Sequence, residues 1–148
     1  LLKIKYFKSL SKNSLKPREG ILDVIQYAIK NNIKIGFITT TTKDTLDLIT
    51  DNLSKHIDFS KFDLITHDGF IKKRKPDPEI YKYALKKLNV NYSYSIAIEN
   101  TIETYNSAIK AKINTIFYPG EYTTYEKNIK FSLNILNSIK QFFEEGSV

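Results

Sequence analysis

The chain has 148 residues, of which 41% are hydrophobic and 13% aromatic, so it can form one domain with a hydrophobic core. It contains no cysteine, which excludes a disulfide framework, a thiolate metal site and a cysteine nucleophile. No apolar run approaches the roughly 18 residues of a membrane-spanning helix, and no signal peptide is recognised. These features predict a soluble protein of the cytoplasm, or of an equivalent organellar stroma, without a membrane partner.

The formal net charge of +7 would suit a nucleic-acid partner. The lysines, however, are spread along the whole chain and do not gather in one stripe. We therefore rank nucleic acid below a small anionic substrate, which a positive field would also attract. The sequence leaves the oligomeric state open.

The apolar pattern predicts strands that alternate with helices. Residues 1–16 read as the end of a helix followed by a connector. The later elements are, in order, a helix carrying Ile21, Ile25, Ala28 and Ile29, a strand over 33–38, a helix carrying Leu46, Ile49 and Leu53, a strand over 62–66, a helix that begins just past Lys75, a strand over 94–98, a helix carrying Ile102, Tyr105 and Ile109, a strand over 114–118, an edge strand carrying Phe131, Leu133 and Ile135, and a final helix carrying Ile139, Phe142 and Phe143. This alternation predicts parallel βαβ units and an α/β sandwich.

The segment 73–81 places a lysine directly before a helix. Pro76 disfavours helix at Lys75, Asp77 can cap the helix, and Pro78 can occupy its first turn. Lys75 is therefore expected on a stiff loop at the mouth of the helix, where its ammonium suits an anion or a carboxylate. On this segment alone, a proline-capped helix with a solvated lysine is the simpler alternative.

Polar side chains follow three of the predicted strands at the point where each ends. Thr39 and Thr40 follow the first, Lys75 lies in the loop after the second, and Glu99 with Asn100 ends the third. In an open parallel sheet these carboxyl ends form one rim, where ligands bind. A hydroxyl, an ammonium and a carboxylate are the groups that a phosphate with Mg²⁺ requires. Taken singly, the threonines are explained as a helix cap and Glu99 as an acid at a helix start.

Four motifs follow one another along the chain: residues 17–21 (PREGI), 35–42 (IGFITTTT), 75–81 (KPDPEIY) and 96–101 (IAIENT). In this order they resemble the haloacid dehalogenase (HAD) superfamily, its β-phosphoglucomutase-like branch and most closely the CbbY-like sugar phosphatases. The resemblance implies a HAD-like Rossmannoid three-layer sandwich with a parallel sheet. It also implies that residues 17–148 form the C-terminal part of the core domain, with 1–16 a remnant of the cap and connector helix.

By the same resemblance, Thr39 and Thr40 would bind the phosphoryl group of the substrate, and the Thr39 hydroxyl would contact the group in transfer. Lys75 would be catalytic with Thr39, because its ammonium balances the charges of the nucleophile and the phosphate. Glu99 and Asn100 would hold the Mg²⁺ cofactor. The implied substrate is a small phosphorylated sugar.

The chain also departs from the family pattern. The family has a second acid where Asn100 supplies only an amide oxygen, and small residues where Thr104 and Lys112 stand. The family's nucleophile is an aspartate on an N-terminal strand, whereas the earliest aspartate here is Asp23, inside a predicted helix. We therefore expect the sheet to lack its first, central strand.

The leading hypothesis is that the parent protein is a HAD-type, Mg²⁺-dependent hydrolase acting on sugar phosphates through an aspartyl-phosphate, with the phosphomutase reaction ranked below it. As a fragment without the nucleophile, the chain is expected to be inactive. The alternative is a non-catalytic phosphate-binding remnant of the HAD fold. Nucleic-acid binding, which rests on charge alone, ranks third.

Overall fold

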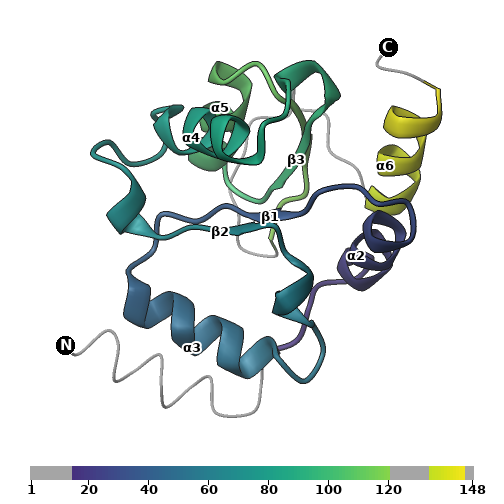
Figure 1. The fold of residues 1–148 in the computed structure, drawn as a ribbon, viewed down its shortest axis with the longest axis horizontal. Helices are drawn as coiled ribbons and strands as arrows, with labels where there is room; N and C mark the ends of the chain where they lie inside the picture. The colour runs from purple at the N-terminus through teal and green to yellow at the C-terminus, as the bar shows by residue number, and fades with distance from the viewer. Residues whose placement is uncertain (1–14, 121–133, 146–148) are drawn as a thin grey trace. The chain divides into compact units, whose positions relative to one another are not determined.

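The structure is a computed structural model that describes residues 15–120 and 134–145 (Figure 1). The chain divides into two compact units, Leu1–Gly69 and Phe70–Val148. The elements are α2 (Ile21–Lys30), β1 (Gly36–Phe37), α3 (Lys43–Leu53), η1 (Phe59–Lys61), β2 (Leu64–Ile65), η2 (Asp68–Phe70), α4 (Glu79–Leu88), η3 (Tyr92–Tyr94), β3 (Ile96–Glu99), α5 (Ile102–Lys110), β4 (Asn114–Phe117) and α6 (Ile135–Glu144). The predicted alternation of helices and parallel strands is confirmed.

In the first unit, β1 and β2 form a parallel pair in which Gly36 lies opposite Leu64 and Phe37 opposite Ile65. The amide of Thr66 continues the ladder by donating to the Phe37 carbonyl at 3.0 Å. The buried apolar residues of this unit are Ala28, Leu46, Ile57 and Leu64. The carboxyl end of β1 leads into the threonine run 39–42, and that of β2 leads into Thr66.

The strands of this unit are shorter than the predicted ranges 33–38 and 62–66. The amide of Ile35 donates to the side-chain Oδ2 of Asp63 at 2.8 Å and not to a strand carbonyl. The Ile35 carbonyl accepts from the Asp63 and Leu64 amides at 2.8 and 3.4 Å. A side chain thus takes the place of a backbone partner, and the regular ladder begins only at Gly36.

In the second unit, β3 and β4 are parallel and pair along their full length, from Ile96 opposite Asn114 to Glu99 opposite Phe117. Helix α5 packs against both strands, and α4 packs against α5. The core includes the fully buried Ile80, Ala108 and Phe117. The described residues hold two two-stranded sheets, one in each unit. That a central strand is missing from the fold stays a prediction.

The predicted edge strand near the C-terminus is wrong at Ile135, which begins α6. The Asn134 side chain accepts the Asn137 amide at 3.1 Å and so caps the helix. Ile135 and Ile139 lie four residues apart on one face and are 1% and 4% exposed, so helical burial outweighs the alternating pattern. Phe131 and Leu133 lie outside the described residues.

Helices α2, α4 and α5 end in the same way, with a positive-φ residue followed by an apolar residue whose amide donates five positions back. This is the Schellman arrangement, in which glycine or asparagine is favoured. The three pairs of residues are Asn32 (φ 54) with Ile33, Asn89 (φ 51) with Val90, and Lys112 (φ 64) with Ile113. Lys112, one of the departures from the family pattern, therefore occupies a position whose backbone favours a residue without a branched or long side chain.

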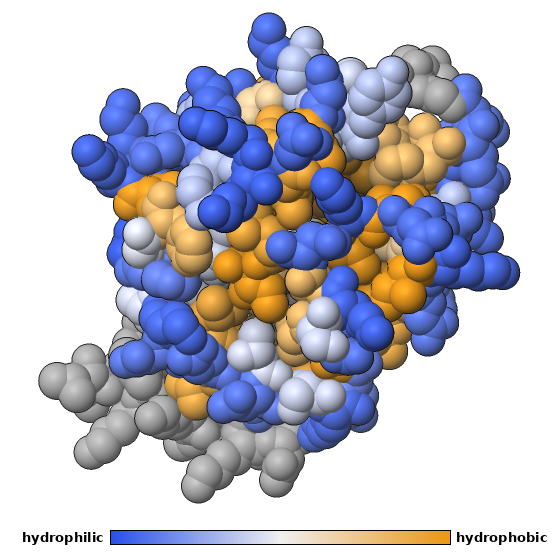
Figure 2. Space-filling model, viewed as in Figure 1, coloured by the Kyte–Doolittle hydropathy of each residue, from blue (hydrophilic) through white to orange (hydrophobic). Residues whose placement is uncertain are grey.

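Within residues 15–120 and 134–145, every helix is too short or too polar to cross a bilayer. Figure 2 shows hydrophobic residues between the hydrophilic ones on one face. The exposed large apolar residues include Phe70 and Tyr94, which are 37% and 78% exposed. Scattered apolar residues are ordinary on protein surfaces, so an exposed ring matters only where other groups gather around it.

Candidate functional site

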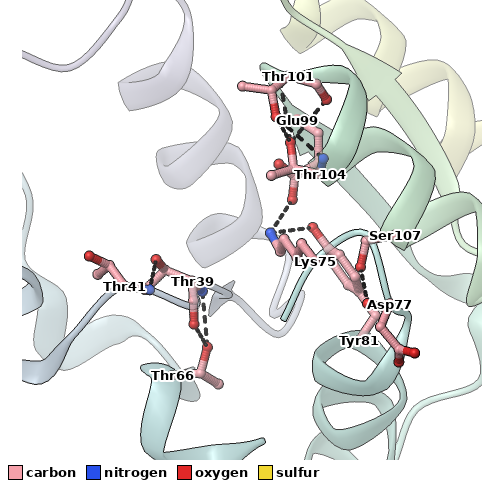
Figure 3. A network of polar contacts seen from close by, with 10 residues as sticks. All are labelled: Thr39, Thr41, Thr66, Lys75, Asp77, Tyr81, Glu99, Thr101, Thr104 and Ser107. Atoms are coloured by element: carbon pink, nitrogen blue, oxygen red, sulfur yellow. Dashed lines mark hydrogen bonds and ion pairs between the residues drawn. The ribbon is translucent and has the colours of Figure 1, made fainter. Parts of the chain in front are cut away.

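Lys75 and Glu99 form a buried ion pair in the second unit (Figure 3). The Lys75 Nζ lies 2.9 Å from the Glu99 Oε1, and the two side chains are 8% and 10% exposed. The ammonium also donates to the Tyr81 hydroxyl at 3.3 Å, and Tyr81 is 4% exposed. The alternative of a solvated lysine is therefore wrong. Charges withdrawn from water persist only when they are paired, so each of these two groups depends on the other.

The loop that carries Lys75 is hydrogen-bonded to two helices, α4, which follows it in the sequence, and α5. The Lys75–Pro76 peptide is cis. The Asp77 Oδ1 accepts the Glu79 amide at 2.9 Å. The N-cap of α4 is nevertheless Pro78 and the helix begins at Glu79, so the prediction of Asp77 as the cap and Pro78 in the first turn is wrong by one position. The Ser107 hydroxyl of α5 donates to the Asp77 carbonyl at 2.6 Å, and Ser107 is fully buried. The hydrogen bonds of Asp77 thus hold the loop, while Glu99 and Tyr81 hold the ammonium itself.

Glu99 is the last residue of β3 and belongs to the strand, where its carbonyl accepts the Tyr118 amide at 2.8 Å. The following helix is capped by Thr101, whose side chain accepts the Thr104 amide, while the Thr104 hydroxyl accepts the Thr101 amide. This capping box explains why a threonine is acceptable at 104. The simpler reading of Glu99 as an acid at a helix start does not fit, because the cap lies two residues further on.

Asn100 is exposed and directly follows the buried Glu99. Together they offer a carboxylate and an amide oxygen, both of which Mg²⁺ accepts as ligands. The part of the chain that the structure describes contains no group of three or more acids or histidines that could hold a metal ion. Because Mg²⁺ usually keeps several waters, the pair fits as a partial ligand set but does not enclose a metal ion by itself.

Thr39 lies in the first unit, just beyond β1, and is held by Thr66. The Thr66 hydroxyl accepts the Thr39 amide at 2.9 Å and donates to the Thr39 carbonyl at 2.8 Å. The Thr39 Oγ1 in turn accepts the Thr41 amide at 3.2 Å. The hydroxyl proton of Thr39 is therefore available to donate to a ligand. Thr40 lies next to it and is half-buried.

The helix-capping interpretation of the threonine run applies to Thr42 and not to Thr39. Thr42 is the N-cap of α3, and its side chain accepts the Thr45 amide at 3.4 Å. The run thus divides into a cap at its end and a separate, backbone-anchored hydroxyl at its start. Lys75 and Glu99 are brought together in the second unit, whereas the meeting of Thr39 with them on one rim stays a prediction.

Three residues that support the site were missed by the sequence interpretation: Thr66, Tyr81 and Ser107. Thr66 is fully buried although it is polar, and it lies at the end of the predicted strand 62–66. Ser107 and Tyr81 each lie on the apolar face of a helix. For these two residues the only signal in the sequence is a polar side chain on an apolar helix face. This signal does not identify the group with which the side chain forms its hydrogen bond.

The sequence also matches known proteins. The family model described as haloacid dehalogenase-like hydrolase matches residues 2–118, more than half of the chain. The chain therefore belongs to this family. It is 30% identical over 110 residues to the protein CbbY of Cereibacter sphaeroides, a match that covers 74% of this chain and 48% of that protein. The chain thus spans about half the length of this curated relative.

Solved structures agree with this assignment. CbbY from Rhodobacter sphaeroides in complex with xylulose-(1,5)bisphosphate is 27% identical, with a TM-score of 0.77, over 88% of this chain and 58% of that one. The β-phosphoglucomutase of Clostridium difficile is 29% identical, with a TM-score of 0.72, over 97% of this chain and 64% of that one. The resemblance to the β-phosphoglucomutase-like branch and the α/β HAD-like fold are confirmed.

Proposed function

We propose that this chain is the C-terminal part of the core domain of a Mg²⁺-dependent phosphatase that acts on a small phosphorylated sugar. The observation that carries the proposal is the buried pair of Lys75 and Glu99. A lysine held on a braced loop against one carboxylate is a preorganised positive charge of the kind that stabilises a developing phosphoryl charge.

In the proposed reaction, the bond between phosphorus and the sugar oxygen breaks while a bond forms between phosphorus and an aspartate carboxylate of the parent protein. The sugar oxygen would take a proton from a second acid of the parent protein and leave as a hydroxyl group. Water then cleaves this aspartyl-phosphate and releases inorganic phosphate. The Lys75 ammonium would attract the phosphoryl oxygens, and the available proton of Thr39 would donate to one of them. Thr40 would contribute to phosphate binding beside it. Mg²⁺, held by Glu99 and Asn100, would supply further positive charge at the phosphoryl group.

The sugar-phosphate substrate is supported by what the relatives bind. The CbbY structure holds xylulose-(1,5)bisphosphate, and the β-phosphoglucomutase is named for a phosphorylated hexose. The phosphomutase reaction is the second activity that these similarities favour. It differs from phosphatase action in the acceptor, which is a sugar hydroxyl and not water.

A non-catalytic phosphate-binding protein is the alternative, and Asn100 favours it. A neutral, exposed amide beside Glu99 attracts a divalent cation less than a second carboxylate would. The 148-residue chain by itself is expected to show no turnover, because none of its matched motifs supplies the aspartate that would form the phospho-enzyme.

The test compares two purified proteins, the 148-residue chain and a longer protein in which an Asp-x-Asp segment and a cap precede Leu1. Release of inorganic phosphate is measured from pentulose and hexose phosphates and from para-nitrophenyl phosphate. We expect chelator-sensitive release by the longer protein only, with a preference for the sugar phosphates. A longer protein that binds phosphate but releases none from any ester would instead support the non-catalytic alternative.

A further inference from the structure

A second region of the second unit has the features of a binding site and includes none of Thr39, Lys75, Glu99 and Asn100. It is a cavity of about 570 Å³ between the loop that follows η2 and the outer face of α4. Its lining residues are Phe70, Lys72, Lys73, Asp77, Glu79, Lys82, Tyr83 and Lys86. The volume falls within the roughly 300–1,000 Å³ of small-molecule sites.

The charge around this cavity is positive, because four exposed lysines face two acids. The Glu79 carboxylate accepts the amides of Lys72 and Lys73 at 3.0 and 2.8 Å, so its charge is directed at the loop backbone. Asp77 lies 4.0 Å from the Lys73 ammonium. Among the described residues, Lys72, Lys82 and Lys86 form no ion pair. Their ammonium groups are therefore available to an anionic ligand.

An aromatic pair lies beside these charges. The rings of Phe70 and Tyr83 are 5.3 Å apart between centroids and inclined at 57°, and Phe70 is 37% exposed. The exposed part of the Phe70 ring offers a surface on which a planar group can stack. An aromatic face beside exposed ammonium groups is a combination that can recognise a base together with its phosphates.

We propose that this cavity binds a mononucleotide with two or more phosphates, the base stacking on Phe70 and the phosphates meeting Lys82 and Lys86 with the Lys72–Lys73 loop. The loop is already tied to α4 through Glu79, so it loses little freedom on binding. A single aromatic pair has room for one base, which favours a mononucleotide over a nucleic-acid strand. Because the site excludes Lys75, it is separate from the proposed phosphatase site.

The first test uses the ¹⁵N-labelled 148-residue chain titrated with ATP without metal. We expect amide shifts to change at residues 70–73 and 82–86 and not around Thr39 or Glu99. Lys82→Glu with Lys86→Glu should weaken ATP binding at least about tenfold through lost attraction and added repulsion. The control, Lys30→Glu with Lys34→Glu, makes the same change in net charge at exposed positions of the first unit and should leave the affinity for ATP unchanged.

The variant Phe70→Ala distinguishes the contribution of base stacking to ATP affinity from the contribution of charge. It should weaken ATP binding about fivefold or more, as the loss of one base-stacking surface does, and leave tripolyphosphate binding unchanged. The proposal is overturned if both double variants weaken ATP equally, if shifts centre on Thr39 and Glu99, or if tripolyphosphate binds as tightly as ATP. Tighter binding of a twelve-residue oligothymidylate to the same amides would overturn it in favour of nucleic acid.

Discussion

The Ser107 hydroxyl donates a hydrogen bond of 2.6 Å to the carbonyl oxygen of Asp77 and thereby joins α5 to the loop that carries Lys75. The two residues lie 30 positions apart in the sequence. Because Ser107 is fully buried, water cannot replace it as the partner of this carbonyl. The position of the Lys75 ammonium therefore depends on a residue that would not contact a substrate.

Replacing Ser107 by alanine should destabilise the protein by about 1–3 kcal/mol, since it leaves a buried carbonyl without its donor. Urea unfolding followed by circular dichroism measures this change. The control is Ser54→Ala, which removes a hydroxyl that donates to the Asp51 carbonyl at 2.7 Å at an exposed site. There water can substitute, so the cost should stay below about 0.5 kcal/mol. Equal costs for the two variants would contradict the bracing role of Ser107.

The buried pair should be strongly coupled. Lys75→Met and Glu99→Gln should each cost about 3 kcal/mol or more, because each leaves the other group buried without its partner. The double variant should cost clearly less than the two single variants together. Lys43→Met, which removes an exposed ion pair with Asp47, should cost about 0.5 kcal/mol or less. Additive costs in the Lys75 and Glu99 cycle would show that the two groups are independent.

Lys112→Gly should stabilise the protein by up to about 1 kcal/mol, because Lys112 has a φ of 64° at the end of α5, where glycine is favoured. Thermal or urea unfolding measures the difference. Lys110→Gly is the contrast, since position 110 has helical backbone and glycine there should destabilise by as much as about 1 kcal/mol. A destabilised Lys112→Gly variant would mean that the contact of Lys112 with the Tyr92 ring outweighs the backbone strain.

The helices and the residues that follow the strands could be predicted from the sequence, because apolar periodicity and proline position are local signals. Those signals located Lys75 and Glu99 but not the links that brace them. Thr66 holds Thr39 across 27 positions, and Ser107 holds Asp77 across 30. Such links depend on how helices and strands pack, which no local pattern specifies. The same limit explains Ile135, where an alternating pattern predicted a strand and burial against the core favoured α6.

Asn100→Asp should tighten Mg²⁺ binding by about tenfold, because it adds a second negative ligand beside Glu99. Titration of the ¹⁵N-labelled chain with MgCl₂ measures the affinity from the amide shifts of residues 98–101. Asn106→Asp adds the same charge at an exposed position of α5 and should leave the affinity near that of the unchanged chain. Equal gains in both variants would attribute the effect to net charge alone and not to ligation.

The most direct test of the phosphatase proposal is the turnover of the longer protein, which carries an upstream Asp-x-Asp segment, after substitution of Lys75. Lys75→Ala should lower phosphate release from a sugar phosphate by about 10²–10³, the usual cost of one preorganised electrostatic donor. Lys87→Ala removes an exposed lysine of α4 and should leave turnover unchanged. Circular dichroism at the assay temperature establishes that both variants are folded. Folded Lys75→Ala and Lys87→Ala proteins with the same turnover would contradict the proposed role of Lys75.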